Sequence, residues 1–422
     1  MSAPDRSLTE LTPDAVVDGR DSDGSTGLLM LLRNAVDRAR DGDVIEVRFS
    51  GASALEDLTA WSRLRRCELI ATLDAGDHTR SFVRVSSGAA ESPDRGVRLP
   101  RRDGARVDVR DWLVGRVADL PEHAPTYLGF VPRGAVAETG MPSYPFTLNR
   151  KSDVWVDEVL DLYEQAKAQQ WNATTDVPWD LLQPLGDEVE WAVCQLMTFL
   201  AENEYAALYI PAKFLPRINA RYAEVAMFLA TVINDEARHI DAFTKRALAN
   251  GGGLQYAAAL TEHSLYGLLV QEDYFRSSFL LHALGEGTFL DLLEFIERYA
   301  PDPVTADVVR RARLDEGRHV AYGIAHARAQ LRAEPGRAAD LVAAAEDRSA
   351  ALQATSGENP MVKEALGILA ATSTGVTIGG GLDVVTGLFR SMHDHRVRRM
   401  LQIGLDRDTA HAISELHTPN FM

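Results

Sequence analysis

The chain has 422 residues, of which 46% are hydrophobic and 25% charged, with a formal net charge of −17. These proportions are typical of a globular protein, and the length suffices for two or three domains. No apolar run reaches the roughly 20 residues of a membrane span, and the N-terminus lacks the pattern of a signal peptide, so we expect a cytoplasmic protein. The negative charge argues against nucleic acid and membranes as partners. The only cysteines, Cys67 and Cys194, argue against a disulfide framework and a four-thiolate metal site.

Residues 1–89 alternate between strand and helix patterns. Strands are expected at residues 15–21, 44–50, 68–76 and 80–87, and amphipathic helices at residues 27–40 and 54–66. The sequence therefore predicts a small α/β two-layer sandwich as the first domain.

This order of elements resembles the TusA-like sulfur-carrier fold. That family has a Cys-Pro-x-Pro entry to its first helix, whereas this chain has Gly-Ser-Thr-Gly, with Gly24 at the cysteine's place. The resemblance implies a degenerate domain without sulfur transfer, and leaves open a role in docking a partner or substrate.

Residues 90–150 are rich in Arg, Pro and Gly with little periodicity, which predicts an irregular linker. From residue 151 to 422 apolar residues recur at intervals of three and four residues, and this helical pattern is interrupted at Pro and Gly. We expect a mainly helical domain with at least six helices.

Two short motifs carry the chemistry. "DEARH" and "DEGRH" each place a glutamate three residues before a histidine: Glu236 with His239, and Glu316 with His319. Residues three apart share one face of a helix, and here the neighbours on that face are apolar. Because a buried, unpaired carboxylate is costly, a compensating partner such as a metal ion is expected.

Two further glutamates lie on apolar helix stripes. Glu204 faces inward whereas Glu202 falls on another face, and Glu286 also points inward. Each precedes the glutamate of one motif by a similar interval, 32 and 30 residues. Two antiparallel hairpins would therefore bring four carboxylates and two imidazoles around one centre.

The pattern resembles the ferritin-like di-iron carboxylate superfamily, whose four-helix bundle uses one Glu from each of two helices and Glu-x-x-His from the other two. The resemblance covers residues 151 to about 330. It implies two iron ions, with manganese as an alternative, and O2 as co-substrate. The Asp-Glu-x-Arg-His form is similar to the multicomponent monooxygenase and acyl-carrier-protein desaturase branches. In those branches the aspartate supports a ligand histidine of the opposite helix, so Asp235 would support His319, Asp315 would support His239, and Arg238 and Arg318 would balance charge.

Several residues refine this prediction. Phe243 occupies the place of the radical-forming tyrosine of ribonucleotide reductase subunits, and Ala312 that of the third histidine of some N-oxygenases. His282, one turn before Glu286, is either a core histidine or an extra ligand or base. Trp171 is expected in the core or bundle wall.

Three glycines flank the expected ligands: Gly285, Gly287 and Gly317. Glycine is unfavourable inside helices by roughly 1 kcal/mol relative to alanine, so these positions indicate either room for a substrate or close helix packing.

The sequence therefore predicts a non-heme di-iron oxidase or oxygenase acting on a small organic molecule, of monooxygenase, N-oxygenase or desaturase type. It contains no dinucleotide fingerprint, so a ferredoxin or flavin reductase would supply electrons. We expect a homodimer. The alternative is a ferroxidase or iron-binding protein of the ferritin or rubrerythrin type, and a third hypothesis is a metal-free scaffold.

Overall fold

A computed structural model describes residues 11–20, 25–86, 120–137, 140–353 and 359–417. Its contacts divide the chain into two compact units: residues 1–107 with 130–142, and residues 108–129 with 143–422. Of the expected linker, residues 90–150, positions 90–119, 138 and 139 lie outside the described residues. Its described remainder contains the 3-10 turn η1 (Thr126–Leu128).

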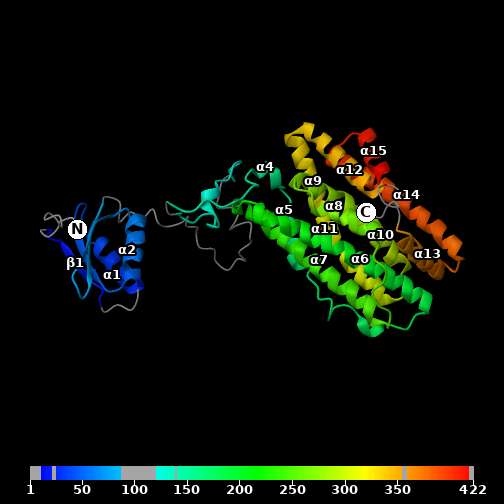
Figure 1. Cartoon of the computed structure of the whole chain (residues 1–422), viewed down its shortest axis with the longest axis horizontal. Coiled ribbons are helices and arrows are strands. Elements are labelled where there is room, and N and C mark those ends of the chain that lie inside the picture. Colours follow the sequence, from blue (N-terminus) through cyan, green and yellow to red (C-terminus); the bar gives the residue numbers. More distant parts are fainter. Residues whose placement is uncertain (1–10, 21–24, 87–119, 138–139, 354–358, 418–422) are drawn as a thin grey trace, which may run out of the picture. The chain divides into compact units, whose positions relative to one another are not determined.

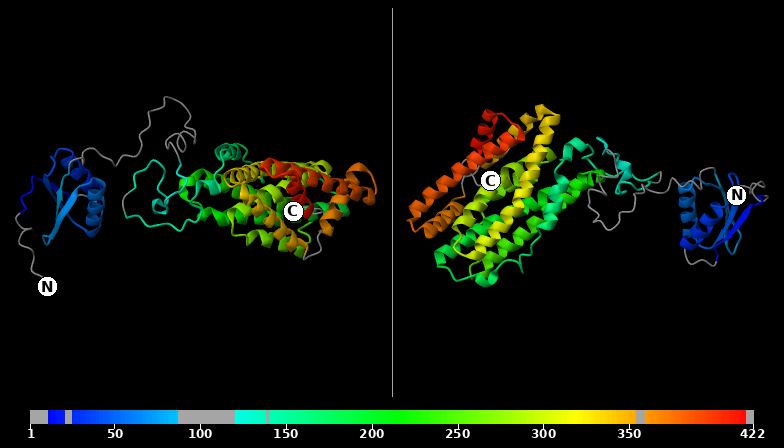
Figure 2. Two further views of the ribbon diagram at one scale, coloured as in Figure 1. Left: turned by 90° about the horizontal axis from the view of Figure 1, so that it is seen from above. Right: turned by 180° about the vertical axis from the view of Figure 1, so that it is seen from behind.

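The first unit is a four-stranded mixed sheet with two helices (Figures 1 and 2). The strands lie in the order β1-β2-β4-β3, with β1 and β2 parallel and the other pairs antiparallel. The elements are β1 (Ala15–Asp18), α1 (Ser25–Val36), β2 (Val44–Phe49), α2 (Ala52–Leu64), β3 (Glu68–Asp74) and β4 (Thr79–Arg84).

This unit has its own hydrophobic core. Leu28 and Leu32 of α1, Leu58 of α2, and Ile45 and Val47 of β2 are buried together. The alternation of strands and helices predicted for this region is therefore observed. The stretch around Gly24, on which the TusA comparison depends, lies outside the described residues, and that resemblance stays a prediction.

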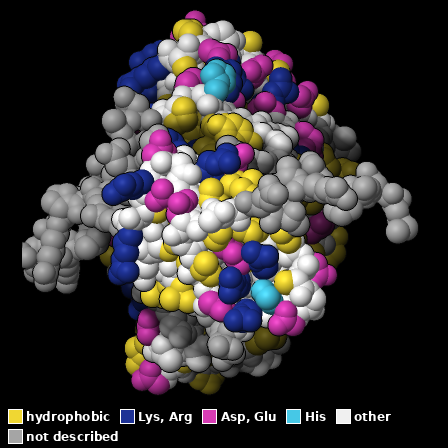
Figure 3. All heavy atoms as spheres, turned by 90° about the vertical axis from the view of Figure 1, so that its left-hand side faces the viewer, with side chains coloured by type: hydrophobic (Ala, Val, Ile, Leu, Met, Phe, Trp, Pro, Cys, Tyr) yellow, Lys and Arg dark blue, Asp and Glu magenta, His cyan; other side chains and the backbone are white. Residues whose placement is uncertain are grey.

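Ion pairs cover part of the sheet surface. Glu46 on β2 accepts hydrogen bonds from Arg48 and Arg80 at 2.7 Å each, and Arg84 pairs with Glu68 at 2.7 Å. Figure 3 shows one face of the molecule, where basic and acidic side chains are likewise interspersed.

The second unit is helical, and the predicted fold class, mainly α with a small α/β domain, is confirmed. Its helices are α4 (Lys151–Val154), α5 (Val159–Ala168), α6 (Asp187–Phe214), α7 (Ala223–Ala249), α8 (Ala259–Leu269), α9 (Tyr274–Ser278), the π-helix η5 (Phe279–Glu286), α10 (Gly287–Tyr299), α11 (Pro303–Ala333), α12 (Ala338–Gln353), α13 (Pro360–Thr374), α14 (Ile378–Ile403) and α15 (Arg407–Leu416). Short 3-10 turns are η2 (Trp179–Leu181), η3 (Leu215–Arg217), η4 (Ala220–Tyr222) and η6 (Pro335–Arg337).

Four rods form the central bundle. Helix α6 pairs with α7, and the continuous run α9–η5–α10 pairs with α11, while α7 and α11 also touch (Figure 1). Helices α13 and α14 cover α6, α10 and α11 on one side. These are the two hairpins that the spacing of the glutamates predicts.

Local sequence sets where the rods begin. Asp302 caps α11 by accepting a hydrogen bond from the backbone N–H of Thr305, and Pro303 occupies the first turn, where its missing N–H costs nothing. Helix α6 begins after Gly186 with acidic residues in its first turn, where their negative charges interact favourably with the positive end of the helix dipole.

Two apolar clusters divide the bundle along its length. One contains Phe228 of α7 and Tyr322 of α11, and the other contains Phe243 of α7 and Val309 of α11. Residues 235–239 and 315–319 therefore lie between the clusters, about halfway along the rods.

Of the described residues, no single helix is long and apolar enough to cross a membrane. One pair, α13 and α14, meets the length and composition limits only when taken together, and it is bent by 112° at its junction.

Candidate metal centre

All six predicted ligand residues are brought together inside the bundle. Glu204 comes from α6, Glu286 from the end of η5, and the two Glu-x-x-His pairs from α7 and α11. Each is at most 5% exposed. None faces solvent, as the apolar stripes around them indicate.

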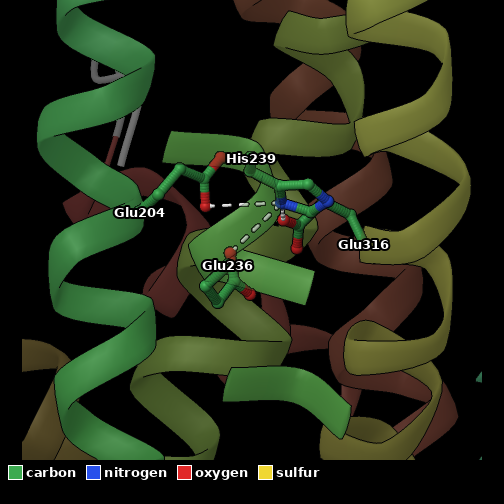
Figure 4. Close-up of side chains that lie close together, drawn as sticks. All are labelled: Glu204, Glu236, His239 and Glu316. Atoms are coloured by element: carbon green, nitrogen blue, oxygen red, sulfur yellow. Dashed lines mark hydrogen bonds and ion pairs between the residues drawn. The ribbon is translucent and has the colours of Figure 1, made fainter. Parts of the chain in front are cut away.

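The first group of ligands surrounds His239. Its Nδ1 lies 3.2 Å from Glu236 Oε2 and 3.4 Å from Glu316 Oε1. Glu204 Oε2 lies 3.8 Å from the same nitrogen. Figure 4 shows these side chains converging from three helices.

The second group surrounds His319. Its Nδ1 lies 3.0 Å from Glu236 Oε1 and 3.3 Å from Glu316 Oε2. Glu286 Oε1 completes the group at 3.9 Å. Within each group one ligand atom per residue lies within 4.8 Å of the others. Because Glu236 and Glu316 belong to both groups, the cluster has two neighbouring positions for cations with two shared carboxylates.

The polar atoms of this cluster fit metal ions. Among the described residues, no hydrogen-bond partner exists for Glu204 Oε1, Glu236 Oε1, Glu286 Oε1, Glu316 Oε2 and His319 Nδ1. Buried polar atoms are rarely left without a partner, since each costs about 1–3 kcal/mol. Carboxylate and imidazole donors in two overlapping sets are suited to two divalent ions such as iron or manganese.

Electrostatics point the same way. Burial and the facing Glu236 carboxylate raise the pKa of Glu204 well above its usual range. Burial likewise raises the pKa of Glu286, although His282 lies beside it. Crowded acids that hold protons in the absence of a cation release them when a divalent ion binds.

The aspartates of the two motifs make contacts across the two helices. Asp315 Oδ2 lies 3.2 Å from His239 Nε2, and Asp235 Oδ2 lies 3.3 Å from His319 Nε2. Each imidazole thus has its Nε2 on an aspartate of the opposite helix and its Nδ1 toward the cluster. Such a contact fixes the ring orientation of a metal-binding histidine.

Two arginines join the aspartates. Arg238 donates to Asp315 at 2.8 Å, and Arg318 donates to Asp235 at 2.9 Å. Burial alone would raise the pKa of Asp315, but the hydrogen bond with His239 and the charges of His239 and Arg318 outweigh it and lower that pKa. Both aspartates are therefore ionised and hold a buried network of alternating charge.

The sequence analysis did not predict the contacts that three neighbours make with this network. Trp171 donates its Nε1–H to Asp315 at 2.7 Å and stacks on His239 at 6.3 Å. Gln170 accepts from Arg238 at 2.7 Å, and Gln169 accepts from Arg318 at 2.6 Å. They follow the end of α5, where no helical stripe reveals which way a side chain points. Trp171 lies in the bundle wall, as expected, but also orients the site.

His282 belongs to the cluster's edge. Its Nδ1 lies 2.7 Å from Glu286 Oε2, so it is a satisfied buried histidine that also holds one of the proposed ligands. Both residues lie in η5. π-Helical turns are uncommon in proteins overall, but those that occur are often found at functional sites.

The three glycines near the ligands serve different purposes. Gly285 lines a cavity at the cluster. A Cβ on Gly287 would lie 2.6 Å from Arg399 Nε, so glycine at this position allows Arg399 to pack closely against the helix. Nothing lies within 4 Å of a Cβ on Gly317. Gly317 is exposed, so it provides no room at the site.

Two cavities adjoin the bundle. An inner cavity of about 30 Å³ is lined by Glu204, Glu286 and Glu316 together with apolar side chains. An outer cavity of about 430 Å³ lies beside α6 and α8. Both are lined by Ala206 and Leu265, so they are neighbours.

Glu202 faces the outer cavity, apart from the cluster, in keeping with its expected face. Glu262 of α8 lines the same cavity. Burial and this neighbouring carboxylate raise the pKa of Glu202 to about 8, so at neutral pH its side chain is mostly protonated.

Two residues that the sequence analysis compared with the resembling superfamily are also buried. The ring of Phe243 is 6.2 Å from His239, and Ala312 is buried in the apolar cluster beyond the ligands. One buried phenol was not expected: Tyr322 lies 5.8 Å from the ring of His282, and its hydroxyl is 2.5 Å from that of Tyr274.

Comparison with known proteins gives structural similarity only. No family model and no curated protein matches the chain. Several solved structures of R2-like ligand-binding oxidase variants resemble it. One with an aerobically reconstituted Mn/Fe cofactor is 20% identical, with 59% of this chain and 93% of that chain covered and a TM-score of 0.43. Another Mn/Fe variant is 18% identical, and the match covers 57% of this chain and 98% of that chain with a TM-score of 0.44. A variant with an Fe/Fe cofactor is 18% identical, and the match covers 60% of this chain and 92% of that chain with a TM-score of 0.43.

Proposed function

We propose that this chain is an oxidoreductase with a non-heme dimetal centre that uses O2 to oxidise a small organic molecule. One observation carries the proposal: two buried groups of three carboxylates and one imidazole share Glu236 and Glu316. A pair of cations bridged by carboxylates suits a reaction that needs two electrons at one place.

The proposed metal ligands are Glu204, Glu236, His239, Glu286, Glu316 and His319. Iron is the proposed metal, with manganese as the alternative, because hard carboxylate and imidazole donors without thiolate suit both. When bound, such a pair supplies electrons to O2 and so provides the oxidising power.

The chain's own residues hold and shield the centre. Asp235 and Asp315 fix the imidazoles, and Arg238 and Arg318 keep those aspartates ionised. Burial of the cluster between two apolar regions excludes bulk water. Each turnover that consumes reducing equivalents would need an external donor, for which a ferredoxin or flavin reductase is proposed.

The outer cavity favours an organic substrate over iron storage. About 430 Å³ lies next to the inner cavity, within the range of ligand sites, and its lining includes Tyr205, Tyr209 and Tyr266. A ferroxidase would need only a path for ions.

The test is metal analysis combined with O2 consumption in the presence of Fe(II) and a chemical reductant. We expect two ions per chain and sustained O2 uptake without growth of a ferric mineral. In Glu316→Ala a ligand shared by both groups is lost, so the metal content and O2 uptake should fall to background. Glu415→Ala, an exposed change on α15, is the control and should behave as the wild type.

O2 uptake retained in Glu316→Ala would refute the site. Iron taken up far beyond two ions per chain, with mineral growth, would support the ferroxidase alternative.

A further inference from the structure

The outer cavity beside α6 and α8 has two carboxyl groups in its wall. Glu202 lines the cavity from α6 and Glu262 lines it from α8, and the two carboxyl groups lie close together. Both oxygens of Glu202 are buried, and neither has a hydrogen-bond partner among the described residues. Two acids this close repel each other when both are ionised, and buried acceptors without donors are costly. A group that is both a cation and a hydrogen-bond donor would satisfy this pair.

Glu190 on the same helix shows how the fold satisfies a buried structural carboxylate. It accepts hydrogen bonds from Arg246 at 2.7 Å and from Asn250 at 2.7 Å, so its charge and its lone pairs have partners within the protein. In contrast, the lining of the outer cavity contains no Lys, Arg or His side chain. The counter-charge for Glu202 and Glu262 is therefore expected from a ligand.

Aromatic and apolar side chains form most of the remaining wall. Tyr205, Tyr209 and Tyr266 line the cavity together with Leu254 and Leu269. Each of these tyrosines is more than half exposed, so its ring is accessible to a ligand. Tyrosine rings attract cations to their faces and also pack against hydrocarbon. The cavity, at about 430 Å³, is therefore suited to a small molecule with a cationic end and an apolar body.

We propose that the outer cavity binds a primary organic ammonium ion, so that the substrate of this oxidoreductase is an alkyl or arylalkyl amine. The inference rests on the proposed function, which assigns the organic substrate to this cavity, and it names the substrate class. A primary ammonium group has one positive charge and three N–H donors, so it can pair with Glu262 and donate to Glu202 at the same time. A carboxylate ligand would instead add a third acid to the cavity.

The acid pair holds the nitrogen apart from the proposed metal ions. Glu202 lines the outer cavity, whereas Glu204 lines the inner cavity at the metal cluster. Ala206 and Leu265 line both cavities and so lie between them. The inner cavity, at about 30 Å³, has room for only one or two water-sized groups. A carbon of the apolar body, and not the nitrogen, therefore lies nearest the cluster.

The experiment measures ligand binding to the Mn(II)-loaded full chain under nitrogen, without turnover. The probes are hexylamine with 1-hexanol and hexanoate, and 2-phenylethylamine with 2-phenylethanol and 3-phenylpropanoate. Calorimetric titration and thermal unfolding report binding, because a ligand of the folded state raises the melting temperature. We expect at least one amine to bind about fivefold or more tightly than its alcohol and its carboxylate.

Variants of α8 test the site without touching the metal cluster, because α8 supplies none of the proposed metal ligands. Glu262→Gln keeps the size of the side chain and removes its charge, so amine affinity should fall about fivefold or more. Tyr266→Leu keeps an apolar wall without the ring and should weaken amine binding about twofold or more. The matched controls are Glu188→Gln and Tyr256→Leu, two exposed positions outside the cavity lining, which should bind amines like the wild type.

The kind of cation provides a second readout. Hexyltrimethylammonium has the charge of hexylamine but no N–H, so it should bind less tightly, because the oxygens of Glu202 need donors. Titration with Ca²⁺ tests an inorganic cation at the acid pair, and we expect no Ca²⁺ binding that depends on Glu262. Without ligand, Glu262→Gln should be at least as stable as the wild type, because it removes the repulsion between two acids.

The inference is overturned if alcohols or carboxylates bind as tightly as the amines, if hexyltrimethylammonium matches hexylamine, or if Glu262→Gln retains amine affinity. Ca²⁺ bound through Glu262, or a clear loss of stability in ligand-free Glu262→Gln, would also overturn it. Metal content is measured in the same samples. Amine binding through Glu262 without two bound ions would refute the proposed function alone, whereas two bound ions without Glu262-dependent amine binding would refute the amine site alone.

Discussion

At the scale of single residues, the crossed aspartates determine how the histidines are held. Each aspartate joins one histidine and both arginines, and Asp315 also accepts from Trp171. A single carboxylate thus connects α7, α11 and the segment after α5. The expected metal chemistry depends on this contact because a free imidazole ring would rotate away from the cluster.

We predict that Asp315→Asn destabilises the metal-free protein by about 3–5 kcal/mol, because Arg238 and Arg318 lose a buried counter-charge. The affinity for metal should fall about 10–100-fold, since His239 loses its orienting partner. Urea unfolding and metal titration measure the two effects.

Trp171→Phe is the matched comparison, because it removes one donor from the same carboxylate and leaves the charges in place. Its cost should be about 1 kcal/mol. An Asp315→Asn protein as stable as Trp171→Phe would contradict the role of the buried charge network.

The proposed ligands were predictable from sequence because their spacing is local. A glutamate three residues before a histidine shares a helix face with it whatever the tertiary fold, and the stripes around Glu204 and Glu286 show which way those residues point. The contacts of Trp171 and Gln170 with the network were not predictable in this way. Both residues follow the end of α5, so no helical stripe shows where their side chains point.

At the scale of elements, the position of Glu286 depends on how closely η5 approaches α11. A Cβ on Gly323 would lie 2.5 Å from His282 Cβ and 3.0 Å from the backbone nitrogen of Ala283. Only glycine allows this crossing, which places His282 and Glu286 opposite the second motif. The π-helical turn itself was not predicted, since periodicity does not distinguish it from an α-helix.

We predict that Gly323→Ala destabilises the helical unit by about 1–3 kcal/mol, because the added methyl group forces η5 away from α11. The same displacement should weaken metal binding through Glu286. Thermal unfolding and metal titration measure both effects.

Gly317→Ala is a control on the same helix. Nothing lies within 4 Å of its Cβ, so it should stabilise the helix by up to about 1 kcal/mol. If both alanine variants gained stability, the close crossing would be refuted.

At the scale of the whole molecule, the chain consists of two units with separate cores. The core around Leu32 and Val47 shares no residue with the two apolar clusters of the helical unit. The boundary predicted at residue 89 falls in a stretch outside the described residues. Separate cores imply that each unit unfolds in its own transition.

The contribution of Glu46 to stability depends on pH, and this dependence can test whether the two units unfold independently. Its hydrogen bonds with Arg80, against the opposing effect of burial, lower its pKa to about 2. A lowered carboxyl pKa contributes stability that is present above the unfolded-state pKa of about 4.5 and is lost as the pH falls toward 2. Because the side chains of Arg48 and Arg80 are about one-third exposed, solvent screening reduces the contribution to about 1–2 kcal/mol.

We therefore predict that Glu46→Gln lowers only the transition of the N-terminal unit at pH 7, by about 1–2 kcal/mol. The difference from the wild type should shrink between pH 4.5 and pH 2, where the native carboxylate becomes protonated. Circular dichroism melts of a fragment of residues 1–89 give the pH dependence, and calorimetry of the full chain shows which transition moves. A shift of the helical transition would mean that the two units unfold together, because Glu46 has its ion-pair partners Arg48 and Arg80 within the sheet.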